Sequence, residues 1–218
     1  GYLTEAILNY VALLGWSPKG EQAEQEIFSL SELIKAFDMS GISKSPAIFD
    51  QAKLDHFNAV YLRSMAPEDF ARVAEPYIRQ TVTDPRFDVA QIAALLQARC
   101  EKLTEIPEKV DFFDKLPAYG IEFYTNKKSK TNPDVCREML QAAIPMLEQL
   151  PQWSAEGIHD GLVSLAEQLG VKNATLMWPV RIAAAGKLVT PGGAVEICRI
   201  LGREETLSRL HAGLAMLS

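Results

Sequence analysis

Residues that could perform catalysis or bind a metal are present in this sequence, but their spacing forms no known catalytic or metal-binding pattern. A zinc site or a disulfide framework requires clustered or evenly paired residues, and the cysteines and histidines here are scattered. They are Cys100, Cys136, Cys198, His56, His159 and His211. The pair Gly192-Gly193 follows Thr190-Pro191 and is typical of a turn, not of a glycine-rich loop that binds phosphate. We therefore expect no catalytic residue and no metal in this chain, and reduced thiols.

Nucleic-acid binding is the other chemistry that charged residues could support. The net charge of −6 argues against it, but net charge does not fix the local potential at a site. Residues 181–218 carry five basic and three acidic residues, an excess of two positive charges that permits an RNA site without requiring one. The most basic local cluster is Lys127, Lys128 and Lys130. It could contact phosphate, but we interpret it as the solvated tip of a loop.

Helical periodicity dominates the elements that must position these residues. Thr4 is predicted as the N-cap of a first helix that ends at Gly15, and residues 29–32 have a capping-box pattern. Between 154 and 169 the apolar residues fall on one helical stripe. Strand-like alternation is missing apart from an ambiguous run at 121–125. The sequence therefore predicts an all-α protein.

Composition and breaks in the pattern indicate the domain organisation. Hydrophobic residues make up 48% and charged residues 23% of the 218 residues, as in ordinary globular domains. No signal peptide and no apolar run long enough for a bilayer is present, so a cytoplasmic protein without membrane contact is expected. Proline or polar stretches at 65–67, 83–87 and 124–133 interrupt the helices. The predicted units are 1–65, 66–112 and 113–218.

A set of sequence blocks runs through almost the whole chain in a fixed order. The blocks are residues 1–17, 28–34, 42–50, 179–186, 190–192 and 201–210. In their sequence and their mutual distances they resemble the C-terminal part of bacterial-type class I glutamyl-tRNA synthetases. Residues 121–133 match that family weakly.

The resemblance implies a fold, a partner and a missing part. It assigns 1–65 to a stem-contact helical domain, and 66–112 and 113–218 to the two helical subdomains of an anticodon-binding region. The implied partners are the glutamate tRNA and the N-terminal catalytic domain of the same protein, and the implied state is a monomer. Both ATP-site signature motifs of the family are absent, so the chain alone is expected to be inactive. ATP and Mg²⁺ would be cofactors of the parent enzyme, with none in this fragment.

Four residues match anticodon-contacting positions of that family. Arg181, Thr190 and Pro191 match residues that address the first two anticodon bases, and Arg99 matches the arginine that reads the third. Splayed-out single-stranded bases are read on their Watson–Crick edges. Arginine offers only donors in a rigid fork, and cytosine presents two acceptors, O2 and N3, where uracil replaces one by a donor. Arg99 is therefore expected to favour the final cytosine of the glutamate anticodon. Thr190-Pro191 would offer a hydroxyl, a carbonyl and an apolar ring edge on a stiff turn.

Each assignment has a plainer alternative. Arg181 could be an ordinary helix-end arginine, and Arg99 could pair with Glu101 or Glu105 on the surface, where ion pairs contribute little. For the whole chain, the alternative is a helical protein-interaction module of synthetase ancestry that has no RNA binding.

Overall fold

The computed structural model of the protein describes residues 1–43 and 46–218, and helices are its main elements. Lys44 and Ser45, which belong to one of the blocks that carry the resemblance, lie outside the described residues. The longer helices are α1 (Thr4–Gly15), α2 (Leu30–Ala36), α3 (Gln51–Ser64), α4 (Pro67–Ile78), α5 (Val89–Leu96), α6 (Ile106–Val110), α7 (Pro133–Glu148), α8 (Ala155–Gln168), α9 (Asn173–Ala185), α10 (Ala194–Leu201) and α11 (Arg203–Met216). Short 3-10 turns are η1 (Gly20–Gln22), η2 (Met39–Gly41), η3 (Gln97–Arg99), η4 (Leu103–Glu105) and η5 (Ile121–Tyr124).

The all-α class is confirmed. Within the two described ranges, extended backbone pairs only in two isolated bridges, Trp16 with Ile42 and Asn126 with Thr131. The run at 121–125 that was ambiguous in the sequence forms the 3-10 turn η5. None of the described helices combines the length and the apolar character that crossing a bilayer requires.

Local start signals place most helix ends where the sequence predicts them. The capping box of α2 forms, because the Ser29 hydroxyl accepts from the Glu32 amide and the Glu32 carboxylate accepts from the Ser29 amide. Ser154 likewise caps α8 through the Gly157 amide. The prediction of Thr4 as N-cap is wrong. Thr4 is the first helical residue of α1, Leu3 is the N-cap, and no side chain caps this end.

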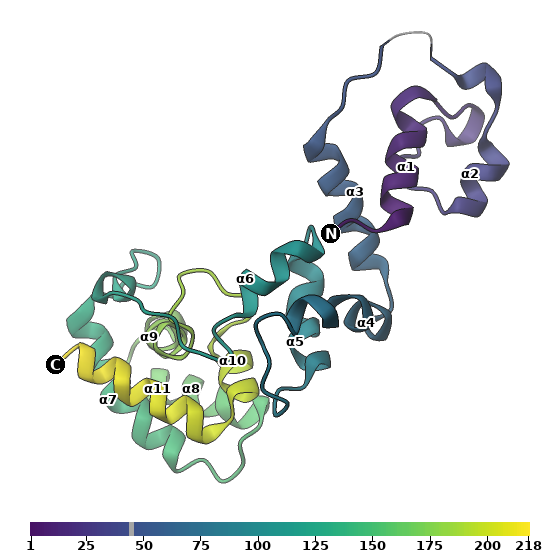
Figure 1. The fold of residues 1–218 in the computed structure, drawn as a ribbon. Coiled ribbons are helices and arrows are strands. Elements are labelled where there is room, and N and C mark those ends of the chain that lie inside the picture. The colour runs from purple at the N-terminus through teal and green to yellow at the C-terminus, as the bar shows by residue number, and fades with distance from the viewer. Residues whose placement is uncertain (44–45) are drawn as a thin grey trace.

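The N-terminal lobe, α1 to α3, has its own small core and lies at one end of an elongated molecule (Figure 1). Tyr10, Leu54 and Phe57 form a cluster separate from the main core. α1 packs on both α2 and α3. Two polar side chains are buried with their partners satisfied: Asn9 contacts the backbone of Glu26 and Phe28, and Asn58 contacts that of Leu3 and Glu101. Asn58 therefore links the lobe to the next unit.

The C-terminal bundle surrounds one helix, α9. It packs against α7, α8, α10 and α11, and Figure 1 shows it end-on among them. A helix covered on nearly all sides must be apolar on nearly all sides, and residues 182–185 of α9 are all fully buried. The main core is continuous from Leu62 in α3 to Leu217. The predicted units 66–112 and 113–218 thus share one core.

Arg209 of α11 joins three segments from inside this core. Its side chain is 3% exposed. The guanidinium donates to the carbonyls of Phe112 (2.7 Å), Phe113 (3.0 Å) and Ala184 (2.8 Å), and pairs with Glu205 at 2.6 Å. These bonds tie the chain after α6 to the last turn of α9. The five basic residues counted between 181 and 218 include Arg209. Its place in that count is wrong, because a buried guanidinium that is paired inside the core is not available to RNA.

Candidate nucleic-acid interface

The loop 187–193 leaves the buried helix α9 through a left-handed glycine. Gly186 has φ 62°, a conformation that a side chain makes costly. A Cβ there would also lie 3.0 Å from the Pro117 carbonyl oxygen and 3.0 Å from the Tyr119 ring. Glycine therefore lets the chain turn sharply under the 117–119 segment. This turn directs the loop toward α6.

Arg181 holds this loop from the last turns of α9. Its Nη1 donates to the Thr190 hydroxyl at 2.8 Å, and its Nη2 donates to the Leu188 carbonyl at 3.1 Å. The guanidinium also stacks 4.6 Å from the centre of the Trp178 ring. Burial lowers the pKa of Arg181, but a guanidinium stays charged at neutral pH. Arg181 is therefore a half-buried support of the loop as well as a charge.

Arg99, which lies in the predicted unit 66–112, contacts the same loop. At the end of η3, its Nη1 donates to the carbonyl oxygen of Pro191 and, at 3.4 Å, to that of Thr190. Arg99 is exposed, and its Nε and Nη2 atoms have no hydrogen-bond partner among the described residues. The alternative pairing with Glu101 or Glu105 is not found there. All four residues that the resemblance assigned to anticodon contact thus lie together.

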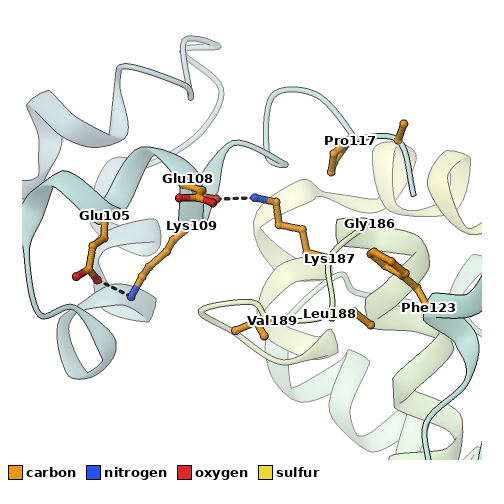
Figure 2. Close-up of a pocket in the computed structure, with 10 residues that line it drawn as sticks. Glu105, Glu108, Lys109, Pro117, Phe123, Gly186, Lys187, Leu188 and Val189 are labelled. Atoms are coloured by element: carbon orange, nitrogen blue, oxygen red, sulfur yellow. Dashed lines mark hydrogen bonds and ion pairs between the residues drawn. The ribbon is translucent and has the colours of Figure 1, made fainter. Parts of the chain in front are cut away.

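Two lysines stabilise the segments around α6: Lys187 joins the loop to α6, and Lys109 joins α6 to the residues before it (Figure 2). Lys187 pairs with Asp111 at 2.6 Å and donates to the Glu108 carbonyl at 2.5 Å. Lys109 pairs with Glu105 at 3.0 Å and donates to the Arg99 carbonyl at 2.9 Å. The Lys109–Glu105 pair has the local i,i+4 spacing, whereas the contacts of Lys187 join residues more than 70 positions apart and have no signal in the sequence.

A groove of about 610 Å³ runs between α6 and the loop. One side is formed by Glu105, Glu108 and Lys109, and the other by the backbone and side chains of 186–189 (Figure 2). Pro117, Ala118 and Phe123 complete an apolar lining. Val189 is 85% exposed at its edge. An apolar trough with charged groups and free arginine donors nearby suits a planar ring that carries polar atoms on its edge.

Thr190 and Pro191 were expected to offer a hydroxyl, a carbonyl and an apolar ring edge to a base, but in the structure these groups contact other residues of the chain or are buried. The Thr190 hydroxyl accepts from Arg181 and donates to the Gly192 carbonyl at 2.7 Å. Pro191 is buried, and its carbonyl accepts from Arg99. In this structure the two residues therefore shape the loop, and the free donors belong to Arg99.

Comparison with known families identifies the region around this groove. The Anticodon binding domain family matches residues 69–214. The catalytic domain family of class I tRNA synthetases (E and Q) matches residues 1–56. The first match covers both sides of the groove, and the second covers most of the N-terminal lobe.

Individual relatives agree with these matches. The chain is 49% identical over 217 residues to the glutamate–tRNA ligase of Clostridium tetani and 43% identical over 217 residues to that of Clostridium acetobutylicum. Each of these two alignments covers 100% of this chain but only 44% of the relative. The crystal structure of a glutamate tRNA ligase from Elizabethkingia meningosepticum, in complex with its amino acid, superposes with a TM-score of 0.83 at 29% identity. It aligns to 100% of this chain, which covers 42% of that protein. The chain therefore belongs to the anticodon-binding domain family, in the form found in glutamate–tRNA ligases.

Proposed function

We propose that this chain is the tRNA-binding portion of a glutamate–tRNA ligase and that the groove between α6 and the loop 187–193 receives the anticodon of the glutamate tRNA. The observation that carries the proposal is the convergence of Arg99 and Arg181 on one loop. The family match over residues 69–214 supports it. No comparison favours the alternative of an interaction module without RNA binding.

The chemistry of the groove fits unpaired bases. A base can lie against the apolar lining formed by Pro117, Phe123 and Leu188 and present its Watson–Crick edge to donors at the rim. The open Nε and Nη2 atoms of Arg99 offer two donors in one plane. Cytosine, with acceptors at O2 and N3, complements that pair.

The three units have separate proposed roles. We propose that residues 1–65 contact the tRNA stem, and that 66–112 and 113–218 form the anticodon-binding region as a monomer. Among the described residues, no group of three or more His, Cys, Asp or Glu could hold a metal ion. We propose that the ATP and Mg²⁺ of the ligase reaction are bound by the part of the relatives that this chain does not match.

Binding of labelled glutamate tRNA across a salt series tests the proposal. We expect salt-sensitive binding, because phosphate contacts release counterions. We also expect tighter binding than to the same tRNA with the final anticodon cytosine replaced by uracil. A folded chain that shows no salt-sensitive binding, or that binds both tRNAs equally, would contradict an anticodon site.

The N-terminal lobe offers a surface for the catalytic domain. α1 exposes Ile7 and Val11, four residues apart, and α2 exposes Leu30 and Ile34 in the same way, with Ile34 69% exposed. α1 and α2 pack together, so these side chains can form one apolar face. The relatives are more than twice as long as the part this chain matches. We propose that this face packs against their catalytic domain.

Thiol labelling of an Ile34→Cys variant tests this docking. The native thiols should not interfere, since burial raises the pKa of Cys100 and Cys136 to about 11 and that of Cys198 to about 12. We expect fast labelling in this chain and at least several-fold slower labelling when the chain is extended to the length of its relatives. Lys128→Cys, at an exposed position between η5 and α7, serves as control and should label equally in both. Equal rates at position 34 would rule out the proposed contact.

A further inference from the structure

The segment 125–132, which matches the family weakly, is a well-defined tight turn. Asn126 and Thr131 pair through two backbone bonds of 3.1 and 3.0 Å. The Asn126 side chain accepts from the Ser129 amide at 2.9 Å, and the Ser129 carbonyl accepts from the Thr175 hydroxyl of α9 at 2.8 Å. Lys130 has φ 54°, the left-handed conformation that closes the turn. The turn is thus fastened both to itself and to the bundle.

Three lysines project from this turn without partners. Lys127, Lys128 and Lys130 are exposed, and none forms an ion pair or a side-chain hydrogen bond within residues 1–43 and 46–218. The lysines that line the groove, Lys109 and Lys187, are by contrast committed to carboxylates. A fixed group of uncompensated positive charges is unusual in a chain of net charge −6 and creates a local field that attracts anions.

The surroundings add to this positive field. The helix α7 begins directly after the turn at Pro133, with Asn132 as its cap. α9 begins at Asn173, and its Thr175 binds both the turn, through Ser129, and the backbone of Lys172. Helix N-termini carry partial positive charge. The nearest carboxylate along the chain, Asp134, is paired with Arg137 at 3.2 Å.

We infer that this lysine turn, residues 127–130, is a contact surface for the phosphate backbone of RNA. It is close to the groove along the chain, because Phe123 lines the groove. Lys127 follows Phe123 by four positions, a stretch of chain that spans at most about 14 Å. The inference rests on the proposed function: an RNA whose anticodon fills the groove would place neighbouring phosphates within reach of the turn. Lysine acts there as a point charge and reads no base.

A salt series with a triple variant tests the inference. Lys127→Gln, Lys128→Gln and Lys130→Gln together should lower the slope of log Kobs against log salt by about 2–3, since each phosphate contact contributes roughly 0.7–0.9. Discrimination between final cytosine and uracil should stay unchanged. The matched Lys→Arg triple variant keeps the charge and should keep the slope of the unaltered chain.

The outcomes separate this inference from the proposed function. An unaltered slope in the glutamine variant, with tRNA still bound, would overturn the phosphate surface and leave the anticodon site standing. Such a result would point instead to a protein partner for the lysines. A chain that binds no tRNA would overturn both proposals. A reduced slope in both triple variants would also overturn the inference, because charge alone would then not explain it.

Discussion

Replacing Arg209 by methionine is expected to lower the free energy of unfolding by about 3–5 kcal/mol. The variant leaves the carbonyls of Phe112, Phe113 and Ala184 buried without a donor. It also removes the closer of the two cationic partners of Glu205, because Arg86 lies 3.9 Å from that carboxylate. An unsatisfied buried polar group costs about 1–3 kcal/mol each. Methionine fills part of the volume, so the loss reflects the missing donors more than a cavity.

Urea unfolding followed by far-ultraviolet circular dichroism measures this effect. For a chain of this size the same loss corresponds to a fall in Tm of about 6–20 °C. Arg199→Met is the matched control, because Arg199 is exposed on α10. Its effect should stay within about 0.5 kcal/mol. A loss below about 1 kcal/mol for Arg209→Met would show that the guanidinium contacts are not needed to hold the chain after α6 to α9.

Local signals were sufficient for most of the fold. Apolar stripes, capping boxes and proline positions depend on residues a few positions apart, so the helices from 154 to 169 and after Ser29 could be predicted directly. The first helix shows the limit of such signals. Thr4 has the right type for an N-cap, yet α1 begins at Thr4 itself, and the amide of Leu3 before it donates to the Asn58 side chain of α3. That contact joins residues 55 positions apart.

The candidate site could not be predicted from local sequence signals, because its residues lie far apart in the sequence. Arg99 and Arg181 converge on residues 190 and 191, and no periodicity relates positions on separate helices. Family resemblance located both arginines, whereas only the structure shows the hydrogen bonds from Arg181 to the loop. Arg209 was missed for a related reason. In the sequence it pairs with Glu205 at i,i+4, a spacing typical of a solvated helix face, and only tertiary packing shows that this face is covered.

Replacing Arg99 by alanine is expected to weaken binding of glutamate tRNA by about 1–3 kcal/mol, or about 5–150-fold. The open guanidinium donors of Arg99 are free to meet two base acceptors, and alanine offers none. Arg99→Lys keeps the charge but loses the fork. We expect lysine to restore part of the affinity and little of the preference for the final cytosine.

Comparison with Arg181→Ala separates base reading from loop support. Arg181 spends its donors on Thr190 and Leu188, so its loss should release the loop and weaken binding to tRNAs with either final base. Arg99→Ala should act mainly on the tRNA with cytosine, because uracil already opposes the donor fork. The measurement is the dissociation constant for both tRNAs with each variant at one salt concentration. Because the salt slope reports phosphate contacts, it should change by no more than about 1 with Arg99→Ala. If Arg99→Ala weakened binding to both tRNAs equally, Arg99 would be a phosphate or loop contact, and the discrimination of the third anticodon base would have to come from another residue.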